Sequence, residues 1–251
     1  MIKIILSGCG GRMGAVVARL ADEDAELQII AGVDRRTDAV LPFPAFTDIA
    51  EYNGEADVIV DFSSPDALVA LLSAAEARKI PLVLCTTGYS APQLDRIRDY
   101  ARKIPIFRSG NMSLGINLLA ELVKRAASVL GSDFDVEIVE RHHRRKLDAP
   151  SGTAIMLADA AGAAFDEKPD YVFDRSARRE ERPKAEIGIS AVRGGTIVGE
   201  HTVIFAGNDE IIELRHSALS REVFAVGAVR AAKYMATVTQ PGMYDMSDVL
   251  A

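Results

Sequence analysis

The densest group of chemically capable side chains lies at residues 140–148, which read Glu-Arg-His-His-Arg-Arg-Lys-Leu-Asp. His142, His143 and Lys146 can each carry a proton, and two arginines lie between them. Such closely spaced cations repel one another, and an anionic ligand would offset that cost. A basic surface turn is the alternative. Adjacent side chains of a strand point to opposite faces, and no histidine pair at i,i+4 follows, so we predict no metal site.

A helix start follows this cluster directly. Ser151, Gly152 and Thr153 come after Pro150 and precede an alanine-rich segment. The first N–H groups of a helix are free to bind a carboxylate or a phosphate, and a glycine there lets the ligand approach closely. An ordinary serine N-cap is the alternative, and it uses the same donors.

A glycine-rich segment follows the first apolar run of the chain. Its spacing is G-x-x-G-x-x-G rather than the standard dinucleotide-binding G-x-G-x-x-G. Asp34 ends the second apolar run, where a carboxylate can accept hydrogen bonds from an adenosine ribose. A tight strand-to-helix turn is the alternative, but the strand, the helix and Asp34 together favour dinucleotide binding. The residues of the segment are Gly8, Cys9, Gly10, Gly11, Arg12, Met13 and Gly14.

Arg35 and Arg36 follow Asp34 immediately. A guanidinium can pair with a ribose 2′-phosphate, whereas Asp34 favours the free 2′-hydroxyl. The sequence therefore carries features of both NADH and NADPH binders, and we expect either cofactor to be used. For Arg36 alone, a solvated turn is the favoured interpretation.

Small polar residues follow two later apolar runs. Ligands of open α/β sheets bind at the carboxyl ends of the strands, so these residues are placed to line a nicotinamide pocket. Taken alone, each segment is equally compatible with a plain loop. The two segments are Cys85, Thr86, Thr87 and Gly88, and Ser109, Gly110, Asn111 and Met112.

The elements that must position these residues alternate along the first third of the chain. Consecutive apolar residues in the short runs are typical of strands buried on both faces of a parallel sheet, and the segments between them read as crossover helices. The pattern predicts a doubly wound, Rossmann-type α/β fold. The expected strands are 2–6, 27–33, 57–62, 82–85 and 104–107, and the expected helices are 15–21, 65–79 and 92–102.

The alternation of short apolar runs and helical segments ends after Asn111. Ser113 is placed to cap a helix through residue 130, a strand covers 135–140, and a second helix starts at Ser151. The charged stretch 166–183 reads as an exposed loop. We expect 185–192, 196–206 and 210–216 to be consecutive antiparallel strands, with a final helix at 220–237. This is a second α+β domain built on a mixed or antiparallel sheet.

Composition narrows the class of protein. Apolar residues make up 49% of the 251 positions, as in globular proteins, and the formal charge of −7 argues against nucleic acid as a partner. No stretch approaches the roughly 20 apolar residues of a membrane span. Two cysteines cannot build a disulfide framework, so we expect a cytoplasmic protein.

Residues 140–154 resemble the signature E-x-H-H-x-x-K-x-D-A-P-S-G-T-A of the 4-hydroxy-tetrahydrodipicolinate (dihydrodipicolinate) reductases of bacterial lysine biosynthesis. The resemblance extends over nearly the whole chain. It includes the glycine segment, Asp61-Phe62-Ser63, Thr86-Thr87-Gly88, Asn111-Met112-Ser113, residues 193–201 and residues 213–221.

The resemblance implies NAD(P)H-dependent reduction of a dicarboxylate ring in the diaminopimelate and lysine pathway. It implies a Rossmann domain of residues 1–112 and 221–251, and a substrate and oligomerisation domain of residues 113–220 that forms a homotetramer. His142 and Lys146 match the family's proton donors, and His143, Gly152 and Thr153 match its substrate contacts. The cofactor contacts fall on residues 8–13, Asp34, Arg35, 85–87 and 109–112. Cys85 departs from the usual glycine, and Met112 from a frequent phenylalanine.

Two rival interpretations stay open. Another nicotinamide-dependent dehydrogenase would share the first 110 residues but has no reason to hold the cluster from His142 to Thr153. A non-enzymatic NAD-binding regulator would need a partner-binding module, and we recognise none in the sequence.

Overall fold

The computed structural model describes residues 1–36 and 40–250, and the chain divides into two compact units. Unit 1 combines Met1–Met112 with the C-terminal segment that begins at Glu222. Unit 2 is the intervening segment Ser113–Arg221. The sequence-based boundary differs from this division at Arg221 alone.

Unit 1 is built on a parallel sheet of seven strands with the order β12-β6-β5-β4-β1-β2-β3. Ile4, Ile5 and Leu6 are fully buried, as expected of a strand covered on both faces. The strand order reverses between β1 and β4, which is where doubly wound folds bind ligands. The strands are β1 (Ile2–Ser7), β2 (Leu27–Val33), β3 (Ala45–Phe46), β4 (Val58–Asp61), β5 (Leu82–Leu84), β6 (Pro105–Arg108) and β12 (Gly242–Tyr244).

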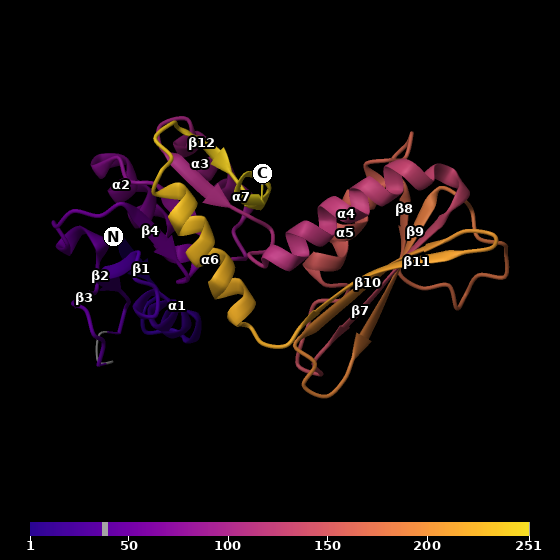
Figure 1. The fold of residues 1–251 in the computed structure, drawn as a ribbon, viewed down its shortest axis with the longest axis horizontal. Helices are drawn as coiled ribbons and strands as arrows, with labels where there is room; N and C mark the ends of the chain where they lie inside the picture. The colour runs from indigo at the N-terminus through magenta and orange to yellow at the C-terminus, as the bar shows by residue number, and fades with distance from the viewer. Residues whose placement is uncertain (37–39, 251) are drawn as a thin grey trace. The chain divides into compact units, whose positions relative to one another are not determined.

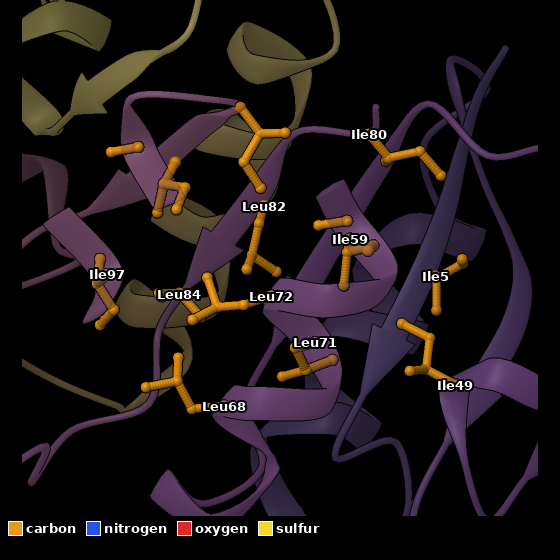
Figure 2. Close-up of a cluster of buried hydrophobic side chains, with 14 of the residues drawn as sticks. Ile5, Ile49, Ile59, Leu68, Leu71, Leu72, Ile80, Leu82, Leu84 and Ile97 are labelled. Atoms are coloured by element: carbon orange, nitrogen blue, oxygen red, sulfur yellow. The ribbon is translucent and has the colours of Figure 1, made fainter. Parts of the chain in front are cut away.

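Helices cover the sheet of unit 1. Leu68, Leu71 and Leu72 of α2 belong to one apolar cluster with Ile59 of β4 and with Leu82 and Leu84 of β5 (Figure 2). Helix α6 packs against α1 and against β4, β5 and β6 (Figure 1). The helices are α1 (Arg12–Asp22), α2 (Leu68–Arg78), α3 (Ala91–Ala101), α6 (Glu222–Met235) and α7 (Met246–Leu250), with 3-10 turns η1 (Ile49–Glu51) and η2 (Pro65–Ala67).

Unit 2 is a mixed sheet of five strands with the order β11-β10-β7-β9-β8, covered on one face by two helices. Ile138 of β7 and Val203 of β10 are buried beneath Val123 of α4 and Leu157 of α5. The elements are α4 (Leu114–Leu130), η3 (Gly131–Asp133), β7 (Asp135–His142), α5 (Gly152–Gly162), β8 (Asp170–Val172), β9 (Glu186–Arg193), β10 (Gly199–Ala206) and β11 (Ile211–Ala218).

The fold class predicted from the sequence is confirmed, but three local expectations are wrong. Strands β9 and β10 are not neighbours, because β7 lies between them and pairs in parallel with β9. The stretch 166–183 contains β8, and Arg175 and Arg182 tie it to Glu137 of β7. Helix α6 is followed by β12, which pairs with β6, and by α7.

Candidate active site

The crevice of unit 1 holds a first cavity, called cavity A, of about 340 Å³. It lies between the carboxyl ends of β1 and β2 and the start of α2. Four of the predicted cofactor residues line it, namely Gly8, Gly11, Asp34 and Arg35. Ser7, Asp48 and Asp66 also line cavity A and were not singled out from the sequence.

A second cavity of unit 1, cavity B, has a volume of about 460 Å³ and shares Phe62, Ser63 and Ser64 with cavity A. The two cavities therefore adjoin at the carboxyl end of β4. Phe224 of α6 also lines cavity B. The predicted cofactor residues brought together here are Met13, Cys85, Thr86, Thr87, Ser109, Gly110, Asn111 and Met112.

Close packing explains why the segment before α1 is rich in glycine. Gly8 has φ +79°, and a Cβ there would lie 2.6 Å from the Phe62 carbonyl. A Cβ on Gly14 would lie 2.2 Å from the Gly8 carbonyl oxygen. The segment thus turns tightly against the end of β4 and leads into α1. The first N–H groups of α1 have no partner within the helix.

Asp34 is held in place by backbone donors. The Gly10 N–H donates to one carboxylate oxygen (3.0 Å) and the Arg36 N–H to the other (3.1 Å). Each oxygen keeps capacity to accept another hydrogen bond. Asp34 is therefore fixed at the wall of cavity A in a geometry that suits ribose hydroxyls.

Three predicted cofactor residues do not line either cavity: Cys9, Gly10 and Arg12. The Cys9 side chain is buried against Gly32, and burial raises the pKa of its thiol. The Gly10 N–H donates a hydrogen bond to the Asp34 carboxylate. Cys9 can therefore contribute to a cofactor site only through its backbone.

Buried polar groups support the wall of cavity B. Asp61, at the end of β4, is fully buried and accepts hydrogen bonds from the N–H and the hydroxyl of Ser63. Burial and the Asp61 charge raise the pKa of the Cys85 thiol well above its usual value. Cys85 is accordingly a neutral wall residue at neutral pH.

In unit 2, Glu140 and His142 form a buried pair at the end of β7. Alternate residues of β7 face the helices, so these two polar side chains follow Val136 and Ile138 on the same face. A Glu140 oxygen lies 2.6 Å from His142 Nδ1. The contact orients the imidazole and leaves Nε2 beside Gly199, where a Cβ would lie 3.0 Å from it.

The Glu140 carboxylate has further donors. Arg193 of β9 donates to both oxygens (2.6 and 2.7 Å), and the Ser151 N–H donates to one (3.0 Å). Burial alone would raise the pKa of Glu140, but these bonds and that of His142 outweigh it and lower the pKa. Burial lowers the pKa of His142, against the opposing effect of Glu140.

The predicted substrate residues lie around this pair. Gly152 opens α5, and a Cβ there would meet open space. Thr153 follows it and is half-buried. His143 Nε2 lies 3.3 Å from an Arg221 guanidinium nitrogen, and the Lys146 ammonium is paired with Asp148 (2.8 Å). Unit 2 thus brings together proton carriers, cations and a helix N-terminus.

From the sequence, no role was assigned to Glu140, Arg193 and His201, although the motif or the resemblance includes them. The role of Glu140 could have been found, because it lies two positions before His142 and so on the same strand face. Arg193 and His201 come from β9 and β10, far along the chain, and the resemblance over residues 193–201 does not indicate that they contact Glu140 and Ser151. Over residues 1–36 and 40–250, no group of three or more metal-ligating side chains is gathered, and no helix is long and apolar enough to cross a membrane.

Two protein-family models match the chain. Residues 2–112 match "Dihydrodipicolinate reductase, N-terminus" and residues 115–250 match "Dihydrodipicolinate reductase, C-terminus". Among curated relatives, the 4-hydroxy-tetrahydrodipicolinate reductase of Caldanaerobacter subterraneus subsp. tengcongensis is 53% identical, covering 100% of this chain and 98% of its own. The reductase of the same name from Clostridium novyi is 49% identical with the same coverage.

Solved structures share the fold. The dipicolinate-bound dihydrodipicolinate reductase of Paenisporosarcina sp. TG-14 superposes with a TM-score of 0.78 at 23% identity, covering 98% of this chain and 97% of that one. A probable dehydrogenase from Thermotoga maritima gives a TM-score of 0.67 at 14% identity, covering 99% and 92%. Because both family models and full-length relatives match, the chain belongs to the dihydrodipicolinate reductase family.

Proposed function

We propose that this protein reduces 4-hydroxy-tetrahydrodipicolinate to tetrahydrodipicolinate with NADH or NADPH, a step of diaminopimelate and lysine biosynthesis in the cytoplasm. The ring loses water, gains a hydride from the cofactor and gains a proton. The relatives at 47–53% identity carry the name of this reductase over their full length. The observation that carries the proposal is the buried Glu140–His142 pair beside the start of α5.

Unit 1 is the proposed cofactor domain. The bound nicotinamide would supply the hydride. Gly8 and Gly11, at the approach to α1, would hold the pyrophosphate, and Asp34 and Arg35 would bind the ribose in cavity A. The residues that line cavity B fit the nicotinamide ring, and Asp61 fixes Ser63 in that wall.

Unit 2 is the proposed substrate domain. The N–H groups at Gly152 and Thr153 would bind one substrate carboxylate, with His143 as a further contact. His142 would deliver the proton, held in one orientation by Glu140, and Lys146 would act as a second donor. Lys146 and the protonated form of His142 would also stabilise negative charge as it develops on the ring.

A coupled assay tests the proposed function. The purified protein should oxidise NADH or NADPH only when pyruvate and aspartate semialdehyde have first been condensed to the substrate. His142→Gln should lower kcat by about 10²-fold, the scale of general acid catalysis, and leave NADH affinity near normal. Undiminished turnover in this variant would remove His142 from the mechanism, and oxidation without the condensation product would point to another dehydrogenase.

The proposed assembly is a homotetramer formed through unit 2. Helices α4 and α5 cover one face of its sheet, and the side chains of the other face are partly exposed, as the alternation along β10 and β11 shows. Exposed Ile211 of β11 and exposed Val192 of β9 lie on strands of this sheet. A sheet face with apolar residues is commonly covered by another subunit. A mass of one chain in sedimentation equilibrium would contradict this assembly.

A further inference from the structure

Four residues of unit 2 form a closed circuit of contacts. Glu140 bonds His142 through one oxygen and the Ser151 N–H through the other. The Ser151 hydroxyl lies 2.9 Å from His201 Nε2. The His201 ring then meets the His142 ring edge-on, with centroids 5.1 Å apart. The circuit joins the proposed proton donor to the first residue before α5.

The Ser151 hydroxyl links the start of α5 to His201. Its oxygen accepts a hydrogen bond from the Ala154 N–H (3.1 Å), which caps α5. A hydroxyl has one proton and two lone pairs, so the Ser151 hydroxyl can either donate to His201 Nε2 or accept from it. His201 is buried, and burial lowers its pKa to about 4, so the imidazole stays neutral at neutral pH.

The strand register places His201 where it can do this. His201 lies opposite Glu140 on β7 and opposite His216 on β11. It is 4% exposed, so it is not placed to bind a ligand from solvent, and its Nδ1 has no hydrogen-bond partner. An imidazole kept in such a position at the cost of an unpaired nitrogen needs a reason beyond packing.

We propose that His201 is a positioning residue that fixes the start of α5, through Ser151, at a set distance from His142. The proposal rests on the proposed function, in which α5 binds a substrate carboxylate and His142 delivers the proton. One rigid circuit would then hold both groups at the separation that the ring of the substrate requires.

The test compares three variants. His201→Leu removes the hydrogen-bonding group, His201→Gln can keep one near the position of Nε2, and His216→Gln is a matched control from the neighbouring strand. Pyridine-2,6-dicarboxylate is the probe of the carboxylate site, titrated calorimetrically. His201→Leu should weaken its binding and lower kcat by about tenfold each, and His201→Gln should recover most of both. NADH affinity should be unchanged in all three, and His216→Gln should match the wild type.

A double-mutant cycle tests the route through Ser151. Ser151→Ala should cause at least the loss of His201→Leu, because it removes the cap at Ala154 as well as the contact with His201. The double variant should lose no more than Ser151→Ala alone, because the His201 contact is already absent there. Additive losses would overturn the proposal, as would a folded His201→Leu protein with wild-type affinity and kcat, or a His201→Gln protein as impaired as His201→Leu.

Amide hydrogen exchange separates this proposal from the proposed function. His201→Leu should speed exchange of the Ala154 amide, whatever reaction the protein catalyses. Faster exchange with unchanged dicarboxylate binding would overturn the positioning role. A wild-type protein that fails to turn over the condensation product would instead refute the proposed function, and the exchange result would still report on the circuit.

Discussion

Hydrogen bonds and an opposite charge stabilise the buried carboxylate of Glu140. It is fully buried, yet three residues donate to its two oxygens, and Arg193 supplies the opposite charge. Removing such partners singly would leave an uncompensated charge in the interior, which is costly. The carboxylate is therefore kept ionised, and an ionised Glu140 is what raises the affinity of His142 for a proton.

Glu140→Gln should change the pH dependence of the reaction. Without the carboxylate, the pKa of His142 falls further below its usual value, because the hydrogen bond and charge that raise it are lost. A general acid must be protonated, so the alkaline limb of the kcat profile should move to lower pH. We expect turnover at pH 8 to drop on the order of tenfold. Glu137→Gln, on the opposite face of β7, is the control and should leave the limb in place.

Arg35 and Arg36 differ in their position relative to cavity A. Arg35 lines cavity A with Asp34, whereas the Arg36 side chain does not. Arg35→Ala should weaken NADPH binding by about tenfold and leave NADH nearly unchanged, the effect of one charge-assisted contact. Dissociation constants from fluorescence titration would measure both, with Arg36→Ala as the control. A parallel loss for the two cofactors would show that Arg35 does not contact a 2′-phosphate.

At the scale of elements, the start of α5 combines a helix cap with an open approach. Ser151 caps the helix, and a side chain at position 152 would extend into unoccupied space. Gly152→Val should therefore raise the Kd for pyridine-2,6-dicarboxylate by at least about tenfold with little change in Tm. Gly152→Ala should give a smaller loss. Equal dicarboxylate affinity in wild type and Gly152→Val would remove this helix start from the substrate site.

At Gly227, helix α6 lies so close to the wall of cavity B that no residue larger than glycine fits there. A Cβ on Gly227 would lie 1.6 Å from the Met112 carbonyl oxygen, and Met112 lines cavity B. Gly227→Ala should destabilise unit 1 by about 1–3 kcal/mol, the usual cost of overpacking, and should weaken NADH binding. Urea unfolding would measure the first effect. Val226→Ala, at an exposed position on the same helix, should change neither.

Elements that depend on interactions between residues close together in the sequence were predictable, and elements that depend on distant pairings were not. Five of the seven strands of unit 1 and the cap at Ser113 were predictable because apolar runs and capping residues act locally, whereas the short strands β3 and β12 were not predicted. The central place of β7 in its sheet depends on pairing with β9 and β10, 40 or more positions away, which periodicity does not encode. Strand β8 was missed because it is three residues long and joins the sheet only by pairing with β9, which follows later in the chain.

The site residues that belong to continuous sequence motifs were predictable, and those brought together only by folding were not. The twelve predicted cofactor residues that line cavities A and B belong to segments that follow strands, and the ends of parallel strands meet at one edge. Cys9 was grouped with them by position alone, although its side chain packs inward. In unit 2, His142 and Gly152 belong to one continuous motif, whereas Arg193 and His201 join them only in the folded sheet.

At the scale of the whole molecule, the two units are interleaved in sequence. Unit 2 is complete at Arg221, whereas unit 1 requires α6 and β12 from the end of the chain. Strand β12 pairs with β6, and α6 packs on β4, β5 and β6. Neither contact can form from the first 112 residues alone.

The order of synthesis on the ribosome therefore differs from the order in which the units can be completed. After residue 112 emerges, about 110 further residues must be translated before α6 begins, which takes roughly 5 to 20 s at ordinary elongation rates. During that interval β6 is an open sheet edge, and the apolar surface that α6 later covers faces solvent. The second unit to be translated can thus finish folding first, and the nascent first unit is the part of the chain that most needs protection by chaperones.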